Sequence, residues 1–344
     1  MADAASRAAI LSVVDLKKHF RSRKGFFGKE SLVRAVDGVS FDVMPGESFA
    51  VVGESGCGKT TLSRLILALE KPTAGSVLFE GRDLAALPRA ELRAARRRLQ
   101  VIFQDPYASL NPRMTVEQIV TEPWTIHGLH RDPEERRRRL HTLLEQCGIA
   151  AAHLRRYPHE FSGGQRQRVG IARALALEPT LIVADEPVSA LDVSIQAQIL
   201  NLLKDLQKEL GLTYVFISHD FSVVRHLCDR VAVMYLGKVV ELAGSETLFK
   251  DPQHPYTEAL LSAVPVPDPA VEKRRKRVIL TGDVPSPLDP PSGCHFHPRC
   301  RYAQPSCREQ APALDQAKPG HLARCPVLPF KDEPSRSALT ELPA

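Results

Sequence analysis

The sequence predicts an α/β fold whose core is a mainly parallel β-sheet. Three observations lead to this prediction. Short apolar segments of strand length alternate along the chain with segments of helical periodicity, which is the pattern of parallel sheets with crossover helices. A glycine-rich octet at residues 53–60 stands between one such strand and a helix. Polar residues directly follow several apolar segments, and the carboxyl ends of parallel strands are where such sheets gather ligands.

Length and composition indicate a soluble globular protein. The 344 residues suffice for two domains, or for one large domain with an appendage. The sequence is 43% hydrophobic and 25% charged, and no apolar run approaches the length of about 18 residues that a membrane span needs. No secretory signal opens the chain, so we expect a cytosolic protein with reduced thiols. The net charge of +6 comes largely from short basic runs. We interpret these runs as solvated helix faces, with anionic lipid headgroups or nucleic acid as the candidate partners otherwise.

The first strands lie before the octet. Residues 8–45 alternate apolar and polar stretches, so we expect antiparallel strands that cover the edge of the core domain. Residues 21–30 are basic and contain glycine, which predicts a loop. The apolar segment 48–52 then leads as a buried strand into the octet, and the residues from Thr61 onward have helical composition.

The octet reads Gly-Glu-Ser-Gly-Cys-Gly-Lys-Thr and fits the phosphate-binding pattern G-x-x-x-x-G-K-[ST]. Its backbone N–H groups can turn toward phosphate oxygens at the start of the following helix. Lys59 can reach the β- and γ-phosphates, and the Thr60 hydroxyl can ligate Mg²⁺. The residues expected to contact a nucleotide are Gly53, Ser55, Gly56, Cys57, Gly58, Lys59, Thr60 and Thr61. Phe20, before the basic loop, is either a core strand residue or an aromatic platform for the adenine ring.

The remaining elements follow in order. Apolar segments at 76–80, 99–103, 181–184 and 213–218 predict strands, and a hairpin is expected across 231–242. The stretch from about 105 to 175 is helical but interrupted by prolines, so we expect a helical subdomain there. A later helix has Ile199, Leu203, Leu206 and Leu210 on one face and ends at Gly211. The expected domains are a nucleotide-binding domain at 8–245, a C-terminal region at 246–330 and a disordered tail at 331–344.

Polar residues suited to one reaction stand at the ends of the predicted strands. Asp185 can hold Mg²⁺, and Glu186 is placed to orient or deprotonate a water that attacks the γ-phosphate. Gln104 can sense the metal and the water, and His219 can hydrogen-bond the γ-phosphate. Taken singly, these residues could be a loop glutamine, capping carboxylates and a core histidine. Their repeated position after buried strands favours the catalytic interpretation, with Thr60, Gln104 and Asp185 as magnesium ligands.

A second anion nest is predicted at Ser162-Gly163-Gly164-Gln165, which opens a helix. One chain cannot easily serve a single nucleotide with two phosphate nests. Two facing chains can, because the loop at Gly53 of one chain and the nest at Ser162 of the other can enclose the same triphosphate.

With these motifs in order, the sequence resembles the ATP-binding subunit of ABC transporters over residues 8 to about 245. Gln104 matches the Q-loop, residues 162–165 the signature, 189–192 the D-loop and His219 the switch histidine. The phrases at 103–112, 187–194 and 254–257 are similar to those of dipeptide/oligopeptide importer ATPases, most of all to the second ATPase of the dipeptide system. Related importers of nickel or glutathione share these phrases.

This resemblance implies a P-loop ABC cassette that hydrolyses ATP to drive peptide import. It implies a peripheral position on the cytoplasmic face of the bacterial inner membrane. The implied partners are a paralogous ATPase subunit, two integral membrane permease subunits and an extracytoplasmic solute-binding protein, with no nucleic acid. The alternative from another class is a soluble ABC ATPase acting on nucleic acid or ribosomes, which only the basic runs support. A regulator without turnover would lack Glu186 or His219, and both are present.

Four cysteines crowd the C-terminal region, at Cys294, Cys300, Cys307 and Cys325. A proline-rich segment with little apolar material needs a staple to fold, and reduced thiols make a metal the natural one. The spacing lacks the short pair usual for zinc, whereas widely spaced thiolates can serve a [4Fe–4S] cluster. Resemblance to the importer ATPases favours the cluster, and zinc remains the alternative because histidines lie nearby, at His295, His297 and His321. We expect the site to be structural and nucleotide binding to be independent of it.

Overall fold

The computed structural model describes residues 8–23, 30–265 and 277–327. These residues divide into two compact units. The first unit contains residues 8–11, 43–48 and 79–217, and the second contains the described residues of 12–42, 49–78 and 218–327. Each unit therefore combines segments that are far apart in the sequence. The phosphate-binding octet and the C-terminal region belong to the same unit.

A parallel sheet forms the centre of the first unit. Strand β7 (Leu181–Asp185) pairs in parallel with β6 (Leu99–Ile102) on one side and with β8 (Thr213–Ser218) on the other. β7 up to Ala184 and all of β8 are buried, which fits apolar strands covered on both faces. The short β5 (Arg82–Asp83) and helix α2 (Arg89–Arg98) also belong to this unit.

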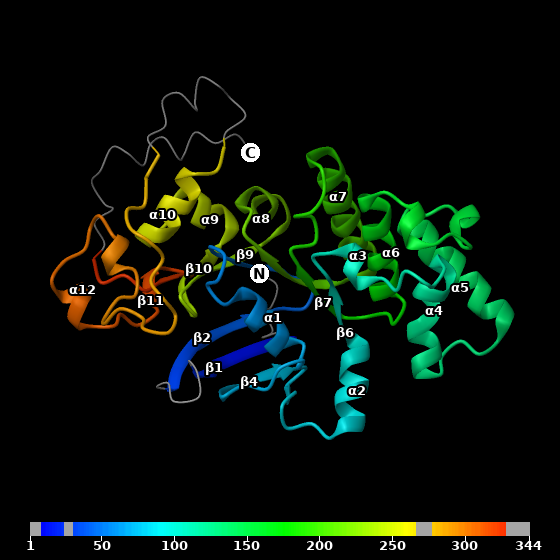
Figure 1. Cartoon of the computed structure of the whole chain (residues 1–344), viewed down its shortest axis with the longest axis horizontal. Helices are drawn as coiled ribbons and strands as arrows, with labels where there is room; N and C mark the ends of the chain where they lie inside the picture. Colours follow the sequence, from blue (N-terminus) through cyan, green and yellow to red (C-terminus); the bar gives the residue numbers. More distant parts are fainter. Residues whose placement is uncertain (1–7, 24–29, 266–276, 328–344) are drawn as a thin grey trace, which may run out of the picture. The chain divides into compact units, whose positions relative to one another are not determined.

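Helices between β6 and β7 confirm the predicted helical segment. They are α3 (Pro106–Ser109), α4 (Val116–His127), α5 (Pro133–Gln146), the 3₁₀ turns η1 (Ala151–His153) and η2 (Pro158–Glu160), and α6 (Gly163–Leu175). Contacts join α4 and α5 to α6 (Figure 1). Two of the prolines expected to interrupt this stretch, Pro106 and Pro158, begin a helix and a 3₁₀ turn, because proline fits the first turn. Pro112 lies in a turn, and Pro123 lies inside α4.

Helix α7 (Val193–Leu210) follows β7 and ends at Gly211, whose φ of 65° is left-handed as expected for a helix C-cap. Ile199, Leu203 and Leu206 are buried along one face. Leu210 is the last residue of α7 and is 44% exposed, so the buried part of this face ends at Leu206.

The second unit contains a mixed sheet. Strand β3 (Ser48–Val52) pairs in parallel with β9 (Arg230–Tyr235), and β9 forms the predicted hairpin with β10 (Lys238–Gly244). Strand β12 (His321–Ala323) pairs antiparallel with β10, and β11 (Asp315–Lys318) pairs antiparallel with β12. The C-terminal region thus adds strands β11 and β12 beyond the hairpin. These strands have only four and three residues, which is too short for a hydrophobic periodicity to predict them.

Further elements of the second unit surround this sheet. Strands β1 (Leu11–Arg23), β2 (Glu30–Val43) and β4 (Ala74–Phe79) lie in the order β2–β1–β4. The helices are α1 (Lys59–Ile66), α8 (Phe221–Leu227), α9 (Ser245–Lys250) and α10 (Pro255–Ser262), followed by η3 (His297–Arg299) and α12 (Ser306–Glu309). Of the helices in the described ranges, none is long and apolar enough to cross a bilayer.

Candidate nucleotide-binding residues and a four-cysteine pocket

The phosphate-binding octet runs from the end of β3 into α1, the strand–loop–helix context that the motif requires. The Lys59 ammonium is buried and donates to the carbonyl oxygens of Gly53 (2.7 Å) and Glu54 (3.0 Å). Gly58 has φ 109°, and a Cβ there would stand 2.0 Å from the Ala35 carbonyl oxygen. Only glycine fits that position, so the last turn before the helix is fixed by close backbone packing.

The other octet residues differ in their exposure. Ser55, Gly56 and Thr60 are exposed, whereas Cys57 is buried. Burial raises the pKa of the Cys57 thiol, so its side chain stays neutral and turned inward. Cys57 can therefore contribute to a nucleotide site only through its backbone, which fits its place at a position of the motif where any residue is allowed.

Phe20 lies on β1 with 39% of its surface exposed. The Lys18 ammonium stands 5.0 Å from the centre of its ring. The interpretation of Phe20 as a core strand residue is therefore wrong. An exposed aromatic face remains compatible with stacking on a base.

His219 follows β8 and is exposed, which excludes a core histidine. The next residue, Asp220, caps α8 by accepting the Ser222 N–H at 2.8 Å. The cap fixes the backbone next to His219 and directs the chain from strand to helix.

Gln104 and Glu186 are brought together in the first unit. The Gln104 side-chain amide donates to the Glu186 carboxylate over 2.8 Å. Asp185 is the last residue of β7, and Glu186 follows it with a left-handed φ of 47°. The Glu186 N–H donates to the Ile217 carbonyl at 2.8 Å, which holds this strained residue against β8.

The predicted anion nest lies at the start of α6, and Ser162 is its N-cap. The Ser162 hydroxyl accepts the Gln165 N–H (3.4 Å), and the Gln165 side chain accepts the Ser162 N–H (3.0 Å). This reciprocal capping box orders the turn that carries both glycines. A Cβ on Gly164 would lie 2.3 Å from the Ile195 side chain of α7, so the turn is pressed against the helix that follows the predicted D-loop.

All four C-terminal cysteines line one pocket of the second unit, together with His254, Pro255, Phe296, His297, Tyr302, Pro326 and Val327. Burial raises the pKa of Cys300 to about 11 and that of Cys325 to about 12. The Cys294 N–H donates to the Cys307 carbonyl at 2.8 Å and ties two of these residues together. Within the described parts of the chain, no three His, Cys, Asp or Glu side chains are arranged to hold a metal ion.

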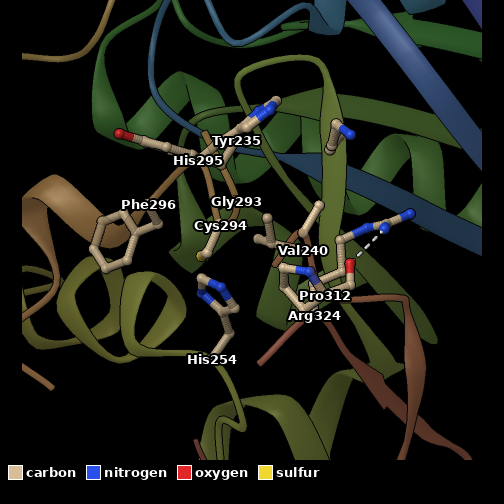
Figure 2. Close-up of a pocket in the computed structure, with 11 residues that line it drawn as sticks. Tyr235, Val240, His254, Gly293, Cys294, His295, Phe296, Pro312 and Arg324 are labelled. Carbon is tan, nitrogen blue, oxygen red and sulfur yellow. Dashed lines mark hydrogen bonds between the residues drawn. The ribbon is translucent and has the colours of Figure 1, made fainter. Parts of the chain in front are cut away.

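A neighbouring pocket shares Cys294, His254 and Phe296 with the first (Figure 2). In Figure 2 the Cys294 sulfur points toward the His254 ring. Burial lowers the pKa of His254 to about 3, and its neutral ring accepts the Tyr256 N–H at 3.1 Å as the cap of α10. Of the histidines considered for zinc, His297 lines the cysteine pocket, His295 lines the neighbouring one, and His321 bonds Glu241 instead.

Sequence reasoning missed Glu54. It occupies a variable position of the octet, yet the structure engages its N–H, carbonyl and carboxylate groups. The sequence did contain a signal that Glu54 has a partner, because an unpaired carboxylate in a phosphate-binding loop would repel the phosphate.

Known proteins resemble this chain over two regions. Residues 36–189 match the family described as ABC transporter, and residues 240–307 match the C-terminal region of oligopeptide/dipeptide transporters. The oligopeptide transport ATP-binding protein AppF of Bacillus subtilis (strain 168) is 53% identical over 324 residues, covering 94% of this chain and 98% of AppF.

Two solved structures share the cassette fold. The structure of cbiO1 from Clostridium perfringens, part of the ABC transporter complex cbiONQ, is 30% identical with a TM-score of 0.61, and the match covers 71% of this chain and 91% of cbiO1. A dimeric, post-hydrolysis structure of the ATP-binding cassette MJ0796 with ADP and Pi is 32% identical with a TM-score of 0.60, covering 68% of this chain and 98% of that one.

Proposed function

Since this chain belongs to the ABC transporter ATP-binding proteins, we propose that it is the ATP-hydrolysing subunit that powers import of dipeptides or oligopeptides. The observation that best supports this proposal is that one structural unit contains both a complete phosphate-binding loop and a region that matches the C-terminal region of oligopeptide/dipeptide transporters. Import of nickel or glutathione and action on nucleic acid are the weaker alternatives, because the curated relatives are named for peptide transport.

The proposed chemistry assigns one role to each predicted residue. Lys59 and the octet backbone bind the phosphates, and Thr60, Asp185 and Gln104 hold Mg²⁺. Glu186 acts as general base toward the attacking water, and His219 bonds the γ-phosphate. The Gln104–Glu186 hydrogen bond of 2.8 Å supports a shared task for these two side chains. Phe20 is proposed to stack on adenine.

We further propose that the nucleotide is enclosed by two chains. Residues Ser162, Gly163, Gly164 and Gln165 of one subunit would bind the triphosphate held by the loop of a paralogous partner. The dimeric state of the MJ0796 relative supports this proposal. Two permease subunits and a solute-binding protein would complete the importer, with this chain at the cytoplasmic face of the membrane. Residues 8–245 would form its nucleotide-binding domain and residues 246–330 its C-terminal region.

A [4Fe–4S] cluster is the proposed occupant of the four-cysteine pocket. The spacing of the four cysteines lacks the short cysteine pair that is usual for zinc. Four thiols around one pocket suit a larger, multi-atom group better. When bound, it would supply a covalent staple for a segment with few apolar contacts.

Reconstitution tests the proposed function. The chain, its paralogue and the permeases in vesicles should hydrolyse ATP faster when a peptide-loaded binding protein is added, and Lys59→Ala should abolish the response. Stimulation by nickel or glutathione but not by peptides would contradict the peptide assignment, and co-purification with RNA instead of permeases would contradict the transporter.

Metal analysis tests the cluster. Anaerobically purified chain should be brown, absorb near ~400 nm and hold about four irons. Replacing any one of the pocket cysteines by serine should lower the iron content. One zinc without iron would refute the cluster but keep a metal staple, and absence of any metal would refute both.

A further inference from the structure

Glu54 is held from three sides by different parts of the second unit. Its N–H donates to the Tyr256 hydroxyl of α10 over 2.9 Å. Its carboxylate accepts two hydrogen bonds from the Arg299 guanidinium, at 2.8 and 3.2 Å. Its carbonyl accepts the Lys59 ammonium at 3.0 Å. One residue of the phosphate-binding loop therefore connects the C-terminal region to the phosphate-binding lysine.

The Arg299 contact is stronger than an ordinary surface ion pair. Arg299 is 7% exposed and Glu54 28% exposed, so solvent screens their attraction only in part. The two parallel bonds form the bidentate arrangement that fixes both position and orientation. Arg299 also neutralises a carboxylate that would otherwise repel a polyphosphate bound to the adjacent backbone.

Tyr256 is fully buried, so solvent does not compete for the hydrogen bond that its hydroxyl makes with the Glu54 N–H. Its ring packs against Tyr235 of β9 and Phe296, with ring centres 4.7 and 5.4 Å away. The hydroxyl therefore cannot move without displacing this cluster. Because Phe296 also lines the cysteine pocket, the same packing reaches from that pocket to the loop.

We propose that Arg299 and Tyr256 are positioning residues for nucleotide binding, and that through Glu54 the C-terminal region sets the affinity of the phosphate-binding loop. This inference rests on the proposed nucleotide site and makes a different prediction from the expectation that nucleotide binding is independent of the cysteine region. Arg299 directly precedes Cys300 of the pocket, so any change that displaces Cys300 also displaces the group that holds Glu54.

The chain offers a matched control at Arg301, on the other side of Cys300. Its guanidinium bonds the Glu258 carboxylate of α10 at 2.9 Å and the Tyr302 hydroxyl. Arg299→Gln and Arg301→Gln therefore remove the same charge from the same segment, but only the first releases Glu54.

The test is a double-mutant cycle on the full chain, with binding of fluorescent N-methylanthraniloyl-ATP as the probe. Arg299→Gln should weaken binding about tenfold in the natural background, and less than about twofold when Glu54→Gln is already present. Arg301→Gln should stay within about twofold of the unaltered chain, and Arg299→Lys should recover part of the loss because it restores the charge without the fork. In the reconstituted transporter, the KM for ATP should rise more than kcat falls.

Equal losses from Arg299→Gln in both backgrounds, or an equal loss from Arg301→Gln, would overturn the inference. If Arg299→Gln does not fold, Tyr256→Phe decides, since it removes one oxygen and should weaken binding about threefold; unchanged binding refutes the proposed contact. Failure of the unaltered chain to bind the probe, or binding insensitive to Lys59→Ala, would instead refute the nucleotide site itself.

Discussion

Glu186→Gln should stop ATP turnover while leaving the fold and nucleotide binding intact. The glutamine amide oxygen can accept the Gln104 bond that the carboxylate now accepts over 2.8 Å. Glutamine is also unbranched like glutamate, so the cost of the left-handed φ of 47° is unchanged. We therefore expect a stability change within about 0.5 kcal/mol. Loss of a general base costs about 10²–10⁴ in rate, or about 2.7–5.4 kcal/mol in the barrier.

Phosphate release by the reconstituted transporter measures this loss, and probe binding to the full chain checks that the site persists. Glu178→Gln is the matched control, because Glu178 also has a left-handed φ, of 52°, and bonds Arg139 at 2.7 Å instead of a predicted catalytic residue. Natural turnover in Glu186→Gln would remove Glu186 from the role of base. An equal loss of turnover in both variants would indicate that the substitution acts through the left-handed backbone conformation and not through the lost carboxylate.

Three other predictions concern separate parts of the chain. Ser162→Lys should impair hydrolysis by the assembled transporter but leave nucleotide affinity of the isolated chain unchanged, whereas Lys59→Ala should weaken that affinity; equal loss of affinity in both would argue against a two-chain site. In thermal unfolding, Gly58→Ala should destabilise by at least about 2 kcal/mol because its Cβ meets a carbonyl oxygen 2.0 Å away, and Gly170→Ala, with no atom within 4 Å of the added Cβ, should stabilise α6 by about 0.5–1 kcal/mol. Burial raises the pKa of Cys147 to about 12 from 9.0, so the folded state keeps the proton and stability should fall as pH rises from 9.0 toward 12; Cys147→Ala should flatten this slope in denaturant titrations, and an unchanged slope would refute the assignment.

The elements that could be predicted from sequence are those whose signal is local. β8 and the end of α7 at Gly211 match the prediction because an unbroken apolar run and a glycine cap determine them within a few residues. The capping box at Ser162 likewise depends on only four consecutive residues, 162–165.

The features that escaped prediction depend on partners distant in the sequence. Strand β12 exists because Leu322 and Ala323 pair with β10, about eighty residues earlier. Glu54 and Arg299 are 245 positions apart, and nothing in either local sequence indicates the pairing. Phe20 could not be assigned because alternation along a strand does not reveal which face is covered until its neighbours are known.

The pairing of β12 with β10 also limits how such subunits can recombine. Glu241 of β10 is fully buried and accepts the N–H groups of Gln253 (2.5 Å) and His254 (3.0 Å), and its carboxylate also bonds His321 (2.6 Å). A crossover after Gly244 that joined a foreign C-terminal region without a histidine at position 321 would remove a side-chain partner of this buried carboxylate, at a cost of about 1–3 kcal/mol. Exchange of C-terminal regions between paralogues should therefore cost least stability when the β9–β10 hairpin is exchanged with them, which places the exchangeable unit's start before the hairpin and not at residue 245.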